Sequence, residues 1–279
     1  MTHPRHRRVL LAVATALAAV LGLTVASVNL ASAGTAHGHH GPPPAPKPTI
    51  VLVHGAFADS SGWNDVAARL LRKGYDVEAF SNPLRDPISD SAYLKTFLAT
   101  IEGPVVLVAH SYGGVVITNA ATGNPNVKAL VYIAAFAPDA GESVQSMSAL
   151  GGGHSDLADH LVFRPYPGAP PNIYDATIDP AYFHELFAAD LPQSVTKVMA
   201  ATQRPASLLA LGVPSGEPAW KTIPSWFLVA RQDHTIPPEA ERFMAARAGS
   251  HTIEINSSHV AMMSHPDIVT KLITRAAGS

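Results

Sequence analysis

The feature that most constrains the fold is an alternation of short apolar runs with amphipathic stretches, which begins at Thr49. Six runs rich in β-branched and other apolar residues are predicted strands: residues 49–53, 75–80, 104–109, 127–134, 224–230 and 251–256. Several are almost wholly apolar, as is typical of strands covered on both faces. Helices are predicted at residues 61–73, 90–101, 112–122, 238–247 and 264–276. The pattern predicts an α/β fold with a six-stranded, mainly parallel sheet and helices on both faces.

This alternation is interrupted at about residues 138–219, between the fourth and fifth predicted strands. The interruption holds three consecutive glycines at 151–153, many prolines, and several aromatic residues that indicate an ordered segment. Two helices are predicted within it, near residues 180–189 and 193–203. Because an insertion this long between sheet strands is usually functional, we predict that it forms a small lid inside a domain spanning residues 49–279.

The first 33 residues are typical of an export signal. Three arginines precede an apolar run at residues 9–28, and Ala-Ser-Ala at 31–33 provides a cleavage site. The competing interpretation is a retained membrane anchor, because the run is just long enough to span a bilayer. The arginine pair also leaves twin-arginine export open. We predict cleavage after Ala33, a secreted protein, and no stable membrane association after cleavage.

Composition narrows the partners of the chain. Residues 34–48 are rich in Gly, Pro and His and are predicted to be a flexible linker, in which the histidines are expected to be solvated rather than to hold a metal. The 19 Lys and Arg are balanced by 21 Asp and Glu, unlike the basic surface of a nucleic-acid-binding protein. The chain has no cysteine, which excludes thiol nucleophiles and thiolate metal sites. We therefore predict a small-molecule substrate, no nucleic acid, no metal and no cofactor.

A serine after the third predicted strand has the local context of a nucleophile. The strand at 104–109 leads directly into HSYGG (residues 110–114) and then into an apolar helical stretch. In the G-x-S-x-G pattern, the serine sits on a sharp strand-to-helix turn that exposes its Oγ. Ala109 replaces the first glycine, which adds one methyl group, and Gly113 keeps the second half of the pattern. Ser111 is the predicted nucleophile, and the alternative is a serine in an ordinary turn.

The first predicted strand ends in HGAF (residues 54–57). In hydrolases whose nucleophile sits on such a strand-to-helix turn, the oxyanion hole is formed by two backbone N–H groups. One belongs to the loop after the first strand, and the other belongs to the residue after the nucleophile. This layout predicts Ala56 and Tyr112 as the two donors, with Phe57 as the alternative if the loop is shifted by one residue. His54 is expected to brace the loop rather than to act as a base.

A nucleophilic serine needs a base, and the base needs an acid that orients it. Asp233 follows the strand predicted at 224–230, and His259 follows the strand predicted at 251–256. Both then lie at carboxyl ends of strands, where α/β sheets gather their ligands. The predicted catalytic residues are therefore Ser111, Asp233 and His259.

Five rival acids and bases are less suitable. His251 begins a strand and so lies at the wrong end of the sheet, His265 is placed within the last helix, and His234 adjoins the proposed acid. Glu239 and Glu241 lie on the following helix, where we expect them to be solvated.

Taken together, these segments resemble the α/β-hydrolase superfamily from Thr49 to the C-terminus. The stretches that carry the resemblance are HGAFADSSGW (54–63), AHSYGG (109–114), VARQDHTIPPEAERFMA (229–245) and NSSHVAMMSHPD (256–267). They are similar to the small-ester branch, which contains bacterial esterases, plant methylesterases and hydroxynitrile lyases. The resemblance implies a serine carboxylic ester hydrolase whose first and third strands are adjacent.

Two departures from that branch bear on the reaction. The plant lyases carry a lysine directly after the catalytic histidine, where this chain has Val260, and a hydroxyl-bearing residue where this chain has Gly55. Ester hydrolysis is therefore expected rather than lyase chemistry. A lyase, a carbon–carbon hydrolase, a perhydrolase and a non-catalytic ligand binder of the same fold stay open as alternatives.

An apolar substrate pocket is predicted from position in the sequence. Phe57, Trp63 and Phe136, together with Tyr112 and residues of the predicted lid, are expected to shape it. For Trp63 and Phe136, simple core packing is an equally good interpretation.

Overall fold

The structure is a computed structural model that describes residues 46–279; the predicted signal segment and most of the predicted linker lie outside these residues. Its main sheet has six parallel strands in the order β2-β1-β3-β4-β8-β9. The strands are β1 (Thr49–Val53), β2 (Val77–Phe80), β3 (Val105–Ser111), β4 (Val127–Ala135), β8 (Ser225–Ala230) and β9 (His251–Ile255). The α/β fold class and the adjacency of the first and third strands are therefore confirmed.

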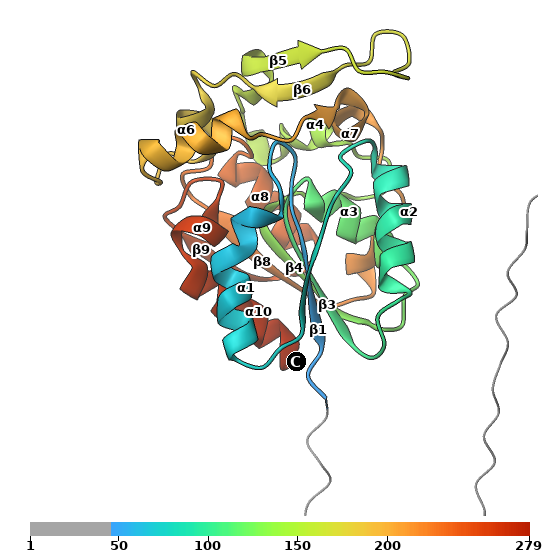
Figure 1. The fold of residues 1–279 in the computed structure, drawn as a ribbon. Coiled ribbons are helices and arrows are strands. Elements are labelled where there is room, and N and C mark those ends of the chain that lie inside the picture. Colours follow the sequence, from blue (N-terminus) through green and yellow to red (C-terminus); the bar gives the residue numbers. More distant parts are fainter. Residues whose placement is uncertain (1–45) are drawn as a thin grey trace, which may run out of the picture. The chain divides into compact units, whose positions relative to one another are not determined.

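Helices cover both faces of this sheet (Figure 1). On one side, α1 (Asn64–Arg72), which follows the short helix η1 (Ser60–Trp63), packs against α10 (Pro266–Ala277). On the other side, α2 (Pro87–Leu98) packs against α3 (Gly113–Ala120). The remaining core helices are α8 (Pro238–Arg247), which packs on β8, and the short α9 (Ala261–Ser264). Because both faces are covered, β3 and β8 are buried along their whole length.

The start of α2 differs from the sequence prediction, which placed it at residue 90. The helix begins at Pro87 because Asp86 caps it: the Asp86 carboxylate accepts hydrogen bonds from the N–H groups of Ile88 and Ser89, both at 2.9 Å. Asp followed by Pro is a helix-start signal, so the earlier start was readable from the sequence.

The insertion between β4 and β8 carries a small sheet that the sequence did not predict. Its elements are α4 (Val144–Met147), η2 (Leu150–Gly152), η3 (Leu157–His160), β5 (Leu161–Arg164), β6 (Asp175–Ile178), α5 (Phe183–Phe187), α6 (Gln193–Ala201), β7 (Ala206–Ser207), α7 (Leu208–Gly212) and η4 (Ala219–Lys221). Strands β5, β6 and β7 pair antiparallel. The insertion lies over the carboxyl ends of the main strands (Figure 1). Its role as a lid stays a prediction.

The core of the domain follows the central strands. On β4, Tyr132 stacks on Phe227 of β8 with ring centroids 5.6 Å apart, and its hydroxyl pairs with that of Thr118 at 2.8 Å. The phenol is thus satisfied within the core, as a buried polar group must be. Within residues 46–279, none of the helices has the length and apolar character needed to span a membrane.

Candidate active site

Ser111 occupies a strained turn at the end of β3. Its φ is +53°, in the left-handed region that non-glycine residues rarely adopt, and its surface is 5% exposed. The two glycines that follow are required by close packing. A Cβ on Gly113 would lie 2.6 Å from the carbonyl oxygen of Val53, and one on Gly114 would lie 2.1 Å from that of Phe136. The turn therefore fits tightly between β1 and the chain after β4.

The loop after β1 lies directly against Ser111. A Cβ on Gly55 would come within 2.5 Å of the Ser111 Cβ and 3.2 Å of its Oγ, so only glycine fits there. This contact puts Ala56, the next residue, beside the serine. Within residues 46–279, the N–H groups of Ala56 and Tyr112 donate no hydrogen bond to another protein group. Both amides are thus available to a ligand, as an oxyanion hole requires.

His259 and Asp233 form a buried pair. The His259 Nδ1 lies 2.5 Å from Asp233 Oδ2, and both side chains are fully buried. The other carboxylate oxygen, Oδ1, accepts hydrogen bonds from the N–H groups of Thr235 at 2.7 Å and Ile236 at 2.9 Å. These amides fix the carboxylate, which in turn fixes the plane of the imidazole. The opposite ring nitrogen, Nε2, is buried and has no hydrogen-bond partner in the described part of the chain.

His110, the residue before Ser111, connects the nucleophile strand to the histidine loop. Its Nε2 lies 2.9 Å from the carbonyl oxygen of His259, and the two rings are 4.4 Å apart. Complete burial lowers the pKa of His110 well below its ordinary value, so His110 is neutral and its Nε2 donates to the carbonyl. No pattern in the sequence singled out His110 for this role.

The insertion contacts the loops that carry the acid and the base. Thr235, beside Asp233, donates its hydroxyl hydrogen to the Leu186 carbonyl at 2.8 Å. Phe187 packs on the ring of His259 at 4.9 Å. The Asp190 carboxylate accepts hydrogen bonds from the Ser258 N–H at 3.0 Å and from the Ser258 hydroxyl. Partial burial acts to raise the pKa of Asp190, but hydrogen bonds from Ser258, together with Ser264 and Ser257, outweigh it and hold the pKa below its usual value.

His54 braces the oxyanion loop. Its Nδ1 lies 2.9 Å from the Gly55 carbonyl, and its Nε2 accepts a hydrogen bond from the Asn82 N–H at 3.0 Å. Arg204 of the insertion also approaches Nε2, at 3.4 Å. Burial lowers the pKa of His54 to about 4, so the ring stays neutral at neutral pH.

The Tyr112 side chain is directed away from the site. Its hydroxyl donates a hydrogen bond to Asp90 at 2.8 Å inside the protein. Burial raises the pKa of Asp90 above its usual value, and burial together with Asp90 raises that of Tyr112 well above its own. Tyr112 thus offers its backbone N–H to the site while its side chain anchors the turn to α2.

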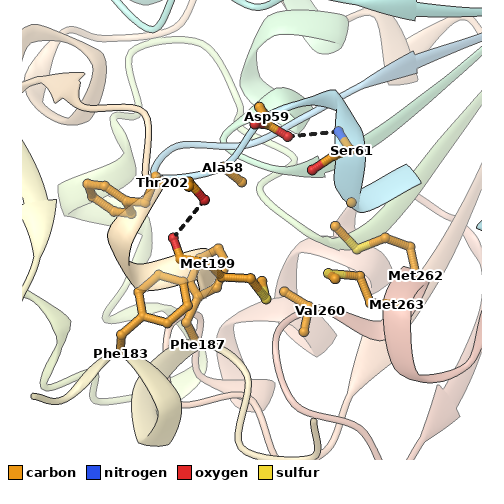
Figure 2. Close-up of a pocket in the computed structure, with 12 residues that line it drawn as sticks. Ala58, Asp59, Ser61, Phe183, Phe187, Met199, Thr202, Val260, Met262 and Met263 are labelled. Atoms are coloured by element: carbon orange, nitrogen blue, oxygen red, sulfur yellow. Dashed lines mark hydrogen bonds between the residues drawn. The ribbon is translucent and has the colours of Figure 1, made fainter. Parts of the chain in front are cut away.

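A small apolar cavity lies next to these residues (Figure 2). Its volume is about 50 Å³. Phe183, Phe187 and Met199 of the insertion face Val260, Met262 and Met263 across it (Figure 2). The rest of its wall comes from the oxyanion loop and η1 and from the end of α6, with residues Phe57, Ala58, Asp59, Ser61, Gly62 and Thr202.

Only Phe57 of the three predicted pocket residues lines this cavity. Trp63 and Phe136 are buried in the core instead, at 1% and 4% exposure. The methionines and Val260 were missed, although Val260 directly follows His259 and Met262 and Met263 follow shortly after.

The rival acids and bases fall in different places. His251 opens β9 and stacks on Trp226, and His234 is exposed. His265 was predicted to lie within the last helix, but it immediately precedes α10. Glu239 is exposed as expected, but the expectation for Glu241 was wrong, because its side chain is completely buried. The signal was present in the sequence: Glu241 shares the helical stripe of Met244 and Ala245, which are also buried.

Comparisons with known proteins agree with this architecture. The chain is 26% identical to the alpha/beta hydrolase nvfD of Aspergillus novofumigatus over 83% of its own length and 97% of the relative. It is 27% identical to methylesterase 17 of Arabidopsis thaliana over 83% and 92% of the two chains. Its fold matches the crystal structure of polyneuridine aldehyde esterase with a TM-score of 0.71 at 21% identity, covering 82% and 99% of the two chains. A model of the alpha/beta hydrolase family matches residues 50–272. The chain therefore belongs to the alpha/beta hydrolase family.

Proposed function

We propose that the protein is a serine hydrolase that cleaves carboxylic esters of small or medium size. The observation that carries this proposal is the buried His259–Asp233 pair. His110, the residue before Ser111, hydrogen-bonds to the carbonyl of His259 and so joins the strand of the serine to the loop of the histidine. The adjacent amides of Ala56 and Tyr112 add a site for negative charge. The names of similar proteins, among them a methylesterase and polyneuridine aldehyde esterase, support an ester substrate.

The mechanism is acyl transfer to water. Asp233 accepts the Nδ1 hydrogen of His259, which leaves the lone pair on Nε2 free to act as the base. As the Ser111 Oγ attacks the ester carbonyl carbon, His259 takes the hydroxyl proton, and the carbonyl oxygen gains negative charge between the two amides. The carbon–oxygen bond to the alcohol then breaks, and His259 returns the proton to the departing alcohol. Water attacks the acyl-enzyme by the same route and releases the carboxylic acid.

In the resting structure, no hydrogen bond within residues 46–279 joins His259 Nε2 to Ser111 Oγ. Such contacts often tighten only when substrate is bound. The backbone of Ser111 is fixed by its turn, and His259 is held by Asp233 and His110. Rotation of the serine side chain would bring Oγ toward His259 Nε2 without a change in the backbone.

The cavity supports an apolar acyl or alcohol group of limited size. Its wall is formed mainly by Phe and Met side chains, and its volume of about 50 Å³ holds only a small group without rearrangement. Methionine side chains are flexible and adapt to irregular ligands. Larger groups therefore require movement of Met199, Met262 or Met263.

The proposal is tested by labelling and by turnover. A fluorophosphonate probe should label the wild-type protein at Ser111 and leave Ser111→Ala unlabelled. Among nitrophenyl esters of increasing acyl length, short and medium chains should be hydrolysed fastest, and Ser111→Ala should remove this activity while its circular dichroism and melting temperature stay those of the wild type. Hydrolysis by Ser111→Ala at the wild-type rate would overturn the assignment. Labelling without hydrolysis of any ester would indicate a different reaction on the same fold.

Export of the protein is also part of this proposal and is supported by the sequence of residues 1–33 alone. After expression in a secreting host, the culture medium should contain a form of the protein that begins at Gly34. A cell-bound form that retains the apolar run would indicate a membrane anchor instead.

A further inference from the structure

Glu241 lies directly beneath the turn that carries Asp233. It sits in the first half of α8 and has no exposed surface. Its Oε2 accepts a hydrogen bond from the N–H of Ala230, the last residue of β8, at 3.1 Å. The carbonyl of the same Ala230 accepts the Asp233 N–H at 3.2 Å. Both residues are thus bonded to Ala230, Glu241 through its side chain and Asp233 through its backbone N–H, and both side chains are buried.

Within residues 46–279, the positive charge that acts on Glu241 is that of Arg242, and it offsets only a small part of the effect of burial. Arg242 is exposed and directs its guanidinium to Glu254, with two contacts of 3.0 Å, and to Glu239 at 3.6 Å. Farther along α8, Arg247 is paired with Glu142 at 2.6 Å. Strand β8 and helix η2, which both pack on α8, carry no titratable side chain.

The turn between β8 and α8 supplies no unpaired buried cation that could compensate a charge on Glu241. Its Arg231 is paired with Glu254 at 3.3 Å, and its His234 is exposed. The remaining charge that faces Glu241 is Asp233, and burial together with this like charge raises the pKa of Glu241 well above its usual value.

The hydrogen bonds around Asp233 leave room for one more donor. A carboxylate has about four acceptor sites, and three of them receive the N–H groups of Thr235 and Ile236 and the Nδ1 of His259. Glu241 Oε1 is buried and has no partner among the described residues. A protonated Oε1 would satisfy both groups at once, whereas an ionised one would leave a lone pair buried beside a second carboxylate.

We propose that Glu241 is a positioning residue that remains protonated in the resting enzyme and donates its Oε1 hydrogen to Asp233. The inference rests on the proposed function only in that Asp233 is taken as the acid of the triad. As the fourth donor, Glu241 holds the carboxylate against rotation and spreads its negative charge, so that Asp233 remains aligned with His259 through the catalytic cycle.

The protonation state has a spectroscopic test that does not depend on activity. The infrared spectrum of the wild type at neutral pH should contain a carbonyl-stretch band of a protonated carboxylic acid that is lost in Glu241→Gln. The matched control Glu239→Gln changes an exposed residue two positions earlier on the same helix and should keep the band. If the spectrum of Glu241→Gln keeps every protonated-acid band of the wild type, the proposal is overturned.

The pH dependence of kcat/KM for a nitrophenyl ester tests the positioning role. Glu241→Gln keeps a neutral donor, so the acidic midpoint of the profile should stay within about 0.3 pH unit of the wild type. Glu241→Met removes the donor, so charge concentrates on Asp233, and the acidic midpoint should rise while kcat falls about tenfold; Glu241→Gln should keep most of that kcat. If Glu241 were ionised, Glu241→Gln would remove a negative charge near His259 and lower the midpoint by about one unit or more, which contradicts the proposal.

The two proposals fail separately. If the wild-type band disappears in Glu241→Gln but Ser111 is not labelled, the protonated Glu241 is supported and the serine hydrolase is refuted. If the wild type is labelled and active but its spectrum has no band that depends on Glu241, the serine hydrolase is supported and the protonated Glu241 is refuted.

Discussion

The backbone N–H of Ser258 donates a hydrogen bond to Asp190 at 3.0 Å, which joins the insertion to the residue directly before His259. The same part of the insertion places Phe187 on the imidazole ring and accepts the hydroxyl hydrogen of Thr235 through Leu186. The segment from α5 to Asp190 is therefore fixed to both loops that carry the acid and the base. The insertion therefore supports the two loops through direct contacts.

Loss of the Asp190 carboxylate should loosen the histidine loop. Asp190→Ala removes the acceptor of the Ser258 N–H and hydroxyl, so we expect kcat/KM to fall about five- to tenfold and the unfolding free energy to fall by about 1 kcal/mol, the usual net value of a hydrogen bond. Asp190→Asn keeps one acceptor oxygen, so its kcat/KM and its unfolding free energy should lie between those of Asp190→Ala and the wild type. The control is Glu185→Ala, which removes an exposed acid from α5. Equal kinetics for Asp190→Ala and the control would contradict the support role.

A methyl group on Gly55 should lower activity by about two to three orders of magnitude. In Gly55→Ala, the new Cβ would lie 2.5 Å from the Cβ of Ser111 and 3.0 Å from the His110 carbonyl, so the oxyanion loop must move away from the serine. Displacement of one oxyanion donor costs roughly 10²–10³ in kcat. The matched control is Gly212→Ala, where a Cβ meets no atom within 4 Å. Rates from burst-phase and steady-state kinetics would test this, and a Gly55→Ala enzyme with near wild-type kcat would show that the loop is not the oxyanion donor.

Truncation of Met199 should change acyl-chain preference. Met199 contributes one wall of the cavity from α6 (Figure 2), so Met199→Ala enlarges a space of about 50 Å³. We expect kcat/KM for longer nitrophenyl esters to rise about tenfold relative to the acetate, because one to two more methylenes can be buried at about 0.8 kcal/mol each. Val198→Ala, which shortens the exposed neighbouring residue, should leave the ratio unchanged. An unchanged ratio in Met199→Ala would place the acyl group elsewhere.

Acidification should destabilise the protein through His54. Burial depresses the pKa of His54 in the folded state from 6.5 to about 4, so the unfolded chain binds the proton more readily. The stability that this group contributes is present above pH 6.5 and is lost as the pH falls from 6.5 toward 4, by at most about 1.4 kcal/mol per pH unit. Buried His110 acts in the same direction.

Urea unfolding as a function of pH measures this effect. His54→Gln cannot take up a proton, so its stability should fall less steeply over the same pH window; the remaining slope is due to His110 and to the carboxyl groups whose pKa values are shifted by folding. His251→Gln, which changes an exposed histidine, should keep the wild-type slope. A steeper or unchanged slope in His54→Gln would show that His54 is not the group that titrates on unfolding.

The sequence by itself determined the strands of the main sheet and their order along the chain. Strands β1, β3, β4, β8 and β9 lie within a residue or two of their predicted limits because apolar periodicity and turn residues act locally. For the same reason Ser111, Asp233 and His259 could be placed at the carboxyl ends of strands. The missed start of α2 was a local signal too, an Asp-Pro cap that was not used.

Only the tertiary structure decided what surrounds these residues. The contact of Asp190 with Ser258 joins positions 68 residues apart. Trp63 and Phe136 entered the core instead of the cavity, and Glu241 is buried against the end of β8 rather than exposed to water. A pattern along the chain gives the face on which a side chain lies, but its partner depends on how several elements pack together. The pairing of Asp233 with His259 could therefore be predicted from the sequence, whereas the groups that hold this pair in place could not.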